Sequence, residues 1–451
     1  MDAALLARIQ FAGTIGFHFI FAPMGIGLSW LVFALLTKYR RTGDERYRQL
    51  ARLWSRVLAL SFGIGVATGI TMEFQFGTNW AAYSRFVGDI FGAPLAAEVI
   101  FTFFLESTFL YVLVFGWDRV SPRVHYISSF LVALGSTMSA FFILVANSWM
   151  QTPTGYVLRN GRAELVSFWG AVFSPSMPAR FSHTVDGALM TGVFFLLGVS
   201  ALMLFLRRQE DISRVGLRMS LWLAFIFSVL QLGTGHYSAA MVVRQQPEKL
   251  ASVEGLFQTQ RHAPLLIFGL PDPDTRTVKY AVMVPSGLSI LAYLNPNAEV
   301  TGLDKFPRDE WPPLYLTFFP FHGMFILGMY LIGMPALGIL LMWLGWLDSK
   351  RLIGKLYLLL AAVTMPVPIL CNELGWMTAE CGRQPWIVYH LMKTKDAISV
   401  SVPASHILAS MIIFGIIYLL LGLVWLILVA REVARGPGEP AGGSYGGGEP
   451  A

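Results

Sequence analysis

Charged residues are scarce in this chain, and their scarcity indicates its class. Only 13% of the 451 residues are Asp, Glu, Lys or Arg, whereas 55% are hydrophobic. Soluble proteins carry about 25% charged residues, because a globule in water must cover its core with polar side chains. The composition therefore excludes an ordinary soluble protein and a disordered one. It favours a chain that crosses a membrane several times.

Cysteine is also nearly absent. Cys371 and Cys381 are too few for a disulfide scaffold, and they form no C-x-x-C zinc or covalent-heme motif. No phosphate loop or Ser-His-Asp signature is found. The net charge of +6 is small, and the basic residues concentrate in short loops. That distribution is typical of membrane topology rather than of nucleic-acid binding.

Long apolar segments predict an all-α fold, a polytopic membrane helix bundle with about nine transmembrane helices. A helix needs about 20 apolar residues to cross a bilayer. The first segment is long enough to span, so we expect it to be retained rather than cleaved as a signal peptide. The candidate spans are 10–37, 54–75, 94–116, 126–147, 183–206, 217–240, 314–344, 353–372 and 403–430.

Basic loops predict the orientation of the bundle. Segments 38–56, 207–218 and 348–355 hold seven, four and three Lys or Arg residues. A loop expected at 76–93, on the opposite side, carries only Arg85. Because cytoplasmic loops are enriched in Lys and Arg, the N-terminus is expected outside and the C-terminus inside.

The order of apolar spans and polar segments divides the chain into four parts. A polar, Pro-rich loop at 241–313 would lie outside, and it is long for a connection, so we expect it to be functional. The Gly- and Pro-rich end would be a flexible cytoplasmic tail. The parts are a six-helix membrane region (1–240), the external loop (241–313), a three-helix membrane region (314–435) and the tail (436–451).

Several polar residues lie in or next to the apolar segments, where placing them in a membrane costs free energy. An ionisable group inside a membrane costs about 2.5–3.5 kcal/mol, so each is a functional candidate. His18 lies in the first span, His183 opens the fifth, Met324 lies in the seventh and Glu380 follows the eighth, all in the outer half. His and Met together form a low-spin heme ligand pair. The alternatives are a hydrogen-bonded histidine, a packing methionine and a Glu380–Arg383 ion pair.

The third span carries two carboxylates. Glu98 and Glu106 are eight residues apart, which is about 12 Å along a helix. Buried carboxylates at such a stagger can relay protons. Ser139 and Asn147 repeat the spacing on the fourth span. These four residues predict either a proton path or a set of interhelical hydrogen bonds.

Five segments together resemble subunit I of the cytochrome bd family of quinol oxidases, and the resemblance covers nearly the whole chain. QPEKLASVEG, with Lys249 and Glu254, is similar to the family's quinol loop in a version without the long insertion. On loop position alone, these two residues would be solvated charges. The other segments are GVATGITMEFQFGTNWAAYSRFVGDIFGAPLAAE (65–98), FFLESTF and FGWDR (within 103–119), LVALGSTMSAFFILVANSWMQTP (131–153) and GWMTAECGRQPW (375–386).

The resemblance implies roles for individual residues. His183 and Met324 would ligate a low-spin heme b. His18 and Glu380 would ligate a high-spin heme b and a heme d, in an order that stays open, as does the third heme's type. His322 departs from the family, which commonly has Arg at this position. The remaining implied roles are proton transfer for Glu98, Glu106, Ser139 and Asn147, quinol binding for Lys249 and Glu254, and heme contact for Arg383 and Trp376.

The resemblance also implies an activity. Quinol would be oxidised at the outer side of a bacterial or archaeal cytoplasmic membrane, and oxygen would be reduced to water with cytoplasmic protons, so that charge is separated without a pump. A homologous second membrane subunit is implied, a small single-span subunit is allowed, and no nucleic acid is involved. The residues alone leave two alternatives: a proton-coupled transporter without cofactor, and a heme electron-transfer subunit that does not reduce oxygen.

Overall fold

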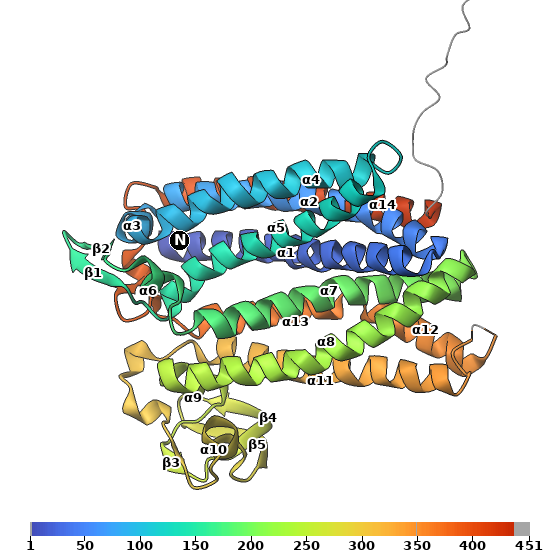
Figure 1. Cartoon of the computed structure of the whole chain (residues 1–451). Coiled ribbons are helices and arrows are strands. Elements are labelled where there is room, and N and C mark those ends of the chain that lie inside the picture. Colours follow the sequence, from blue (N-terminus) through green and yellow to red (C-terminus); the bar gives the residue numbers. More distant parts are fainter. Residues whose placement is uncertain (1, 349, 437–451) are drawn as a thin grey trace, which may run out of the picture.

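Long apolar helices lie side by side in the computed structural model, which describes residues 2–348 and 350–436 (Figure 1). Within these residues nine helical runs are long and apolar enough to cross a membrane, so the predicted all-α class and span count are confirmed. The runs are α1 (Ala3–Thr42), α2 (Glu45–Thr78), α3–η1–α4 (Ala81–Ala97, Glu98–Phe103, Phe104–Phe115), α5 (Pro122–Gln151), α7 (Met177–Phe205), α8 (Glu210–Gln245), α11 (Leu314–Trp343), α12–α13 (Leu352–Thr364, Val367–Cys381) and α14 (Ala404–Arg435).

Short elements connect the spans. Two-stranded antiparallel ladders pair β1 with β2, β3 with β6, β4 with β5, and β7 with β8. These elements are β1 (Tyr156–Arg159), β2 (Arg162–Leu165), α6 (Phe168–Val172), α9 (Pro247–Val253), β3 (Gln260–Arg261), β4 (Leu265–Asp272), β5 (Thr277–Val284), α10 (Gly287–Tyr293), β6 (Glu299–Val300), η2 (Leu303–Lys305), η3 (Arg308–Glu310), β7 (Trp386–Val388), β8 (Met392–Lys393) and η4 (Thr394–Asp396).

Three predicted boundaries are wrong. The expected loop at 76–93 is mostly helix α3, because Arg85 and Asp89 lower its hydropathy without breaking the helix. Helix α7 begins at Met177, so His183 lies inside the span rather than at its start. Helix α13 continues to Cys381, so Glu380 lies on the eighth span and not after it.

Local signals explain where helices end. Gly43 ends α1 with φ 68°, a left-handed conformation that glycine adopts without strain. Asp44 then caps α2, because its carboxylate accepts a hydrogen bond from the backbone N–H of Arg46 at 3.0 Å. This Gly-Asp pair produces the tight turn between the first two spans.

Helices α1 and α7 form the centre of the bundle. They approach so closely that a Cβ on Gly27 would lie 2.6 Å from the backbone nitrogen of Gly192. Small residues allow this contact, as is common where membrane helices pack. Their close packing places His18 of α1 and His183 of α7 on neighbouring central helices.

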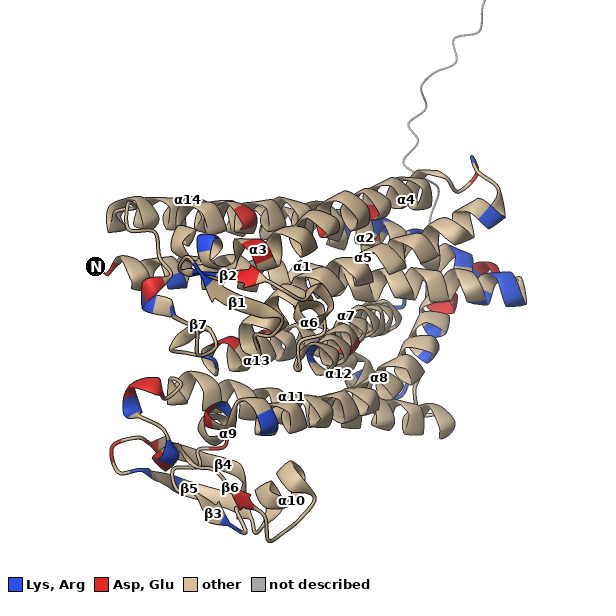
Figure 2. Ribbon diagram, turned by 60° about the vertical axis from the view of Figure 1, so that its left-hand side comes forward, with Lys and Arg blue, Asp and Glu red and all other residues tan. Residues whose placement is uncertain are grey.

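The two ends of the bundle differ in charge. The chain begins at one end, which we call the N-terminal end, and α14 finishes at the other (Figure 1). Lys and Arg gather at that second, basic end (Figure 2). There Arg56 Nε donates to Glu432 Oε2 at 2.7 Å and joins α2 to α14. Of the tail predicted at 436–451, residues 437–451 lie outside the described part of the chain.

The predicted loop at 241–313 is a folded lobe. Helix α8 extends to Gln245, so the lobe occupies residues 247–313 and contains α9, α10 and the β4–β5 hairpin. It has its own apolar core, in which Leu250, Leu256 and Leu288 are buried. The lobe lies beside the C-terminal end of α8 and the N-terminal end of α11 (Figure 1).

Candidate functional site

His18 is held between α1 and α2. Its Nδ1 lies 3.0 Å from the hydroxyl oxygen of Thr68. That hydroxyl donates its own hydrogen to the carbonyls of Ile64 and Gly65, so it can only accept from the imidazole. Nδ1 therefore carries the proton, and the lone pair is on Nε2, the atom that would bind a metal. A Cβ on Gly69 would lie 3.4 Å from His18 Cε1, so glycine keeps space beside the ring.

His183 repeats this arrangement between α7 and α8. Its Nδ1 lies 3.2 Å from Thr234 Oγ1, which is also 3.3 Å from the carbonyl oxygen of Gln231 and can donate there while it accepts from the imidazole. A Cβ on Gly235 would lie 3.3 Å from His183 Cε1. Among the described residues, His183 Nε2 has one hydrogen-bonding neighbour, the Gln231 side chain, at the long distance of 3.5 Å. Both predicted histidines therefore present a lone pair on Nε2.

Met324 faces helix α13. Its Sδ lies 2.9 Å from the position that a Cβ would occupy at Gly375, so glycine is needed where the thioether meets α13. Trp376 follows on α13 and is half-buried. His322 is turned away to backbone carbonyls, with Nδ1 2.9 Å from Phe318 O and Nε2 3.0 Å from Leu266 O. It anchors strand β4 to α11.

Glu380 lies in a dense polar network at the N-terminal end. Its Oε1 accepts from Asn147 Nδ2 at 3.0 Å and from Gln151 Nε2 at 3.3 Å. Its Oε2 accepts from Arg383 Nη2 at 2.5 Å, and Arg180 Nη2 lies 3.9 Å from Oε1. Both carboxylate oxygens are therefore engaged by cations or amides, as the ion-pair alternative expected. A carboxylate has about four lone-pair positions, which leaves room for one more partner.

Two donors in this network have no partner. Arg180 Nε and Arg383 Nη1 are buried N–H groups without an acceptor among the described residues. Two guanidinium groups also exceed the single charge of Glu380, and a buried cation without a counter-charge is costly. An anion with several oxygens fits this place. The carboxylates of a heme supply such oxygens, so the residues fit that group.

Lys249 joins the lobe to the same network. Its buried Nζ donates to Gln151 Oε1 at 2.6 Å and to Gln246 Oε1 at 2.7 Å. Burial, together with the guanidinium of Arg180, holds the pKa of Lys249 well below its usual value. We call Glu380, Asn147, Gln151, Arg180, Arg383 and Lys249 the Glu380 cluster.

Acidic residues flank Lys249 on α9. Burial raises the pKa of the Glu254 carboxyl to about 8, and Glu254 Oε2 has no partner among the described residues. Glu248 is also buried, but it accepts a hydrogen bond from Tyr389 Oη at 2.5 Å, and His390 Nε2 lies 3.4 Å from it. Of the two carboxyls, Glu254 is therefore the one that can accept a hydrogen bond from a further group.

The predicted proton-path residues divide between two places. Ser139 Oγ donates to Glu98 Oε1 at 2.7 Å, where the helix widens into the π-helical turn η1. Glu106 is 8% exposed and packs against Gly135, where a Cβ would lie 3.3 Å from Glu106 Cβ. Asn147 instead hydrogen-bonds Glu380. The structure thus pairs Glu98 with Ser139 and assigns Asn147 to the Glu380 cluster.

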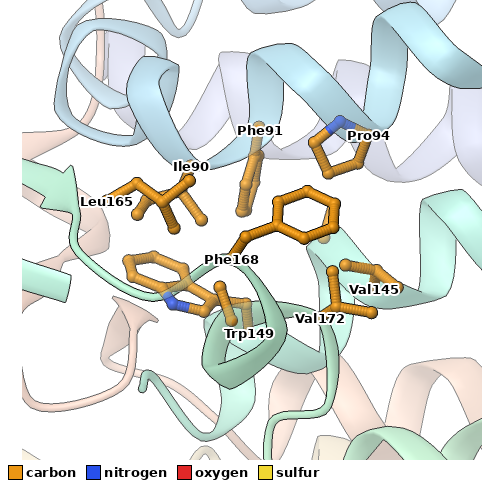
Figure 3. A pocket seen from close by; sticks show the side chains of 10 residues that line it. Ile90, Phe91, Pro94, Val145, Trp149, Leu165, Phe168 and Val172 are labelled. Atoms are coloured by element: carbon orange, nitrogen blue, oxygen red, sulfur yellow. The ribbon is translucent and has the colours of Figure 1, made fainter. Parts of the chain in front are cut away.

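An apolar pocket lies between α3, α5 and α6 (Figure 3). Its lining includes Phe91, Pro94, Val145, Trp149 and Phe168, and none of its ten lining residues is ionisable. Since proton and electron chemistry needs polar or metal-binding groups, the pocket is packing space and not the reactive site.

Several site residues could not be singled out from the sequence. Thr68 and Gly69, and Thr234 and Gly235, form Thr-Gly pairs on the helix that follows each histidine helix. Arg180 stands one turn before His183, and an arginine near an apolar span is itself a signal. The fold and these residues define a multi-span membrane protein with two ligand-ready histidines and a cationic, buried cluster near one end.

Comparisons with known proteins agree with this class. Residues 6–437 match the family described as cytochrome bd terminal oxidase subunit I. The chain is 38% identical over 449 residues to cytochrome bd ubiquinol oxidase subunit 1 of Bacillus subtilis (strain 168), covering 97% of this chain and 94% of the relative. It is 33% identical over 502 residues to cytochrome bd-II ubiquinol oxidase subunit 1 of Escherichia coli (strain K12), covering 97% of each.

A solved structure is similar as well. The bd oxidase from Geobacillus thermodenitrificans superposes with a TM-score of 0.89 at 34% identity, covering 96% of this chain and 99% of that chain. The chain belongs to the cytochrome bd terminal oxidase subunit I family. It is therefore a multi-pass membrane subunit of a heme-bearing terminal oxidase, and the designation subunit I implies a second subunit.

Proposed function

We propose that this chain is the heme-bearing subunit of a quinol:oxygen oxidoreductase that oxidises quinol at the N-terminal end of the bundle and takes protons from the basic end. The observation that carries the proposal is the hydrogen-bond connection from Lys249 through Gln151 to Glu380. It joins the lobe to the cationic cluster at a single buried place. The basic end would be cytoplasmic by the positive-inside rule.

Four side chains would hold the hemes. His183 and Met324 would hold a low-spin heme b, and His18 and Glu380 would hold a high-spin heme b and a third heme, either b or d. The hemes, when bound, supply electron transfer and oxygen reduction. Thr68 and Thr234 fix each histidine in the tautomer with a free Nε2. Arg180 and Arg383 would pair with heme carboxylates through their free N–H groups, and Trp376 would contact a heme.

Quinol would bind against α9. Because its pKa is lowered, Lys249 can exist as a neutral amine and accept a proton from a quinol hydroxyl. Glu254, whose pKa is raised to about 8, can accept the second proton when it is ionised. Both protons would leave on the side of the lobe. A quinol oxidised there contributes to the membrane potential, because the protons consumed in oxygen reduction come from the other side.

Protons would travel along α4 and η1. Glu106 is buried among apolar side chains, and Glu98 is held by Ser139. A carboxyl in each position can take up and release a proton, and about 12 Å of helix separates them. Water or a third group is needed between them.

Oxygen consumption tests the proposal directly. The purified complex with its second subunit should consume oxygen on addition of a soluble ubiquinol or menaquinol analogue, and two quinols should be oxidised per oxygen. A colourless complex without quinol-dependent uptake would favour the cofactor-free transporter. A coloured complex without uptake would favour the electron-transfer alternative.

A further inference from the structure

The β4–β5 hairpin exposes several large apolar side chains. Phe268, Leu270, Tyr280, Val282 and Met283 are between 42 and 79% exposed, and we call them the hairpin patch. Soluble proteins rarely expose a contiguous apolar patch of this kind without a partner. The hairpin patch therefore needs an apolar environment.

Two contacts fix how the hairpin lies along α11. At the hairpin turn, Arg308 Nη2 donates to Asp274 Oδ1 at 3.2 Å, just before α11 begins. At the open end, the His322 ring lies 3.0 Å from the carbonyl oxygen of Leu266. His322 is eight residues into α11, which is about 12 Å along its axis. The hairpin therefore runs beside α11 toward the middle of the bundle.

Helix α11 exposes apolar side chains on its first two turns. Tyr315, Leu316 and Phe319 are 52, 50 and 44% exposed, and all three precede His322 on a membrane-spanning helix. Leu266 therefore lies beside a later turn of α11 than these exposed apolar residues. The hairpin patch continues that surface onto the lobe.

The hairpin becomes less polar from its turn to its open end. Its charged residues are near the turn, where Lys279 Nζ donates to Asp272 Oδ2 at 2.8 Å. The open end has none: Leu265 to Phe268 pair with Val282 to Val284. Backbone carbonyls inside a membrane need a partner within the protein, and His322 Nε2, 3.0 Å from Leu266 O, is such a partner when it carries the ring proton. A tyrosine such as Tyr280 is suited to the lipid–water interface.

We propose that the hairpin patch is immersed in the membrane leaflet at the N-terminal end of the bundle and that phospholipid acyl chains cover it. The turn with Asp272, Asp274 and Lys279 stays at the headgroup level. The lobe is thus an interfacial element clamped to α11 by His322. This placement depends on the described contacts and not on the hemes.

Photolabelling from lipid tests the placement. The complete complex is reconstituted in phosphatidylcholine vesicles that contain a phospholipid with a diazirine in its acyl chain, and labelled peptides are identified by mass spectrometry. The β1–β2 hairpin is the matched control, because it also exposes an apolar residue, Leu158 at 58%, but projects past the helix ends (Figure 1).

The expected result is about tenfold more acyl-chain label on residues 265–284 than on residues 156–165, a ratio that corresponds to about 1.4 kcal/mol. Equal labelling of the two hairpins would overturn the proposal, since the patch would then be in water. Strong labelling of α11 with no label on the patch would also overturn it, because a protein partner would then cover the hairpin.

A second photolabelling experiment places a charge in the hairpin patch. Val282→Asp should lower acyl-chain labelling of the hairpin about tenfold, whereas Leu158→Asp should leave it unchanged. Val282 is 57% exposed, so no core contact is removed. Unchanged labelling of the Val282→Asp variant would overturn the proposal. If that variant fails to accumulate, the proposal is tested by comparing the labelling of the two hairpins in the unmodified complex.

Discussion

Lys249 and Glu380 share one hydrogen-bond partner. Lys249 Nζ donates to Gln151 Oε1 at 2.6 Å, and Gln151 Nε2 donates to Glu380 Oε1 at 3.3 Å. Lys249 and Glu380 are more than a hundred residues apart in sequence, yet one glutamine of α5 links them. A change at Lys249 should therefore affect quinol oxidation and not only the local fold.

Lys249→Met removes the amine that would accept the quinol proton. Loss of a general base lowers a rate by about 10²-fold or more, so kcat of quinol oxidation should fall by that order. Lys279→Met in the same lobe is the control, because Lys279 is exposed and pairs with Asp272 instead of Gln151. Steady-state oxygen uptake gives kcat and KM for both. Equal kcat in the two variants would contradict the role of Lys249.

Glu254 predicts a pH dependence. Burial raises its pKa from 4.5 to about 8, so it is mainly protonated at neutral pH. If its carboxylate accepts a quinol proton, the oxidation rate should rise with pH through about 8, and Glu254→Gln should remove that rise. A rise that persists in the variant would assign the titration to another group.

The same shift predicts a stability trend. Between pH 4.5 and about 8 the folded protein binds more protons at Glu254 than the unfolded chain does. Stability therefore falls as pH rises across this window, by at most about 1.4 kcal/mol per pH unit. In Glu254→Gln the fall should be smaller, which the unfolding midpoint measured against pH would reveal. Parallel curves for the two proteins would contradict the raised pKa.

Thr68→Val removes the acceptor for His18 Nδ1 and keeps the side-chain shape. Loss of such a partner lowers metal affinity about 10–100-fold, so the variant should lose heme. Thr71→Val is the control, because the Thr71 hydroxyl donates to Ala67 O on its own helix and touches no histidine. Heme content is measured as the pyridine hemochrome. Equal heme retention in both variants would mean that Thr68 does not orient the ligand.

Glu106→Gln keeps the shape of the side chain but cannot transfer a proton. Oxygen reduction should slow by about 10²-fold if Glu106 lies on the proton path. Ser107→Ala on the same turn should have no effect, because its hydroxyl contacts only Phe104 O, at 3.4 Å. Normal oxygen uptake in Glu106→Gln would remove this residue from the path.

Much of the fold could be predicted from the sequence. Span length and apolar content depend on local composition, so the nine spans and the basic loops were recognisable. The boundaries failed where polar residues stand on helices, as with Arg85 on α3 and Glu380 on α13. A hydropathy average cannot distinguish a polar helix end from a loop, because backbone hydrogen bonds do not depend on polarity.

The site was harder to predict from the sequence than the fold, because it depends on which helices are neighbours. The sequence identified His18 and His183 but not Thr68 or Thr234, whose hydroxyls orient them from adjacent helices. Equal spacing suggested that Asn147 belongs with the carboxylates of the third span, yet helix packing places it against Glu380. The lobe was expected as a loop because its apolar residues are dispersed over short strands.

The central claim is that His183 ligates a heme. The reduced-minus-oxidised absorption spectrum of the purified complex tests it most directly, with His183→Ala beside the unmodified protein. We predict heme bands in the unmodified protein and selective loss of the low-spin b component in His183→Ala, with the helix content retained by circular dichroism. Identical spectra for the two proteins, or no Soret band in the unmodified one, would contradict the account.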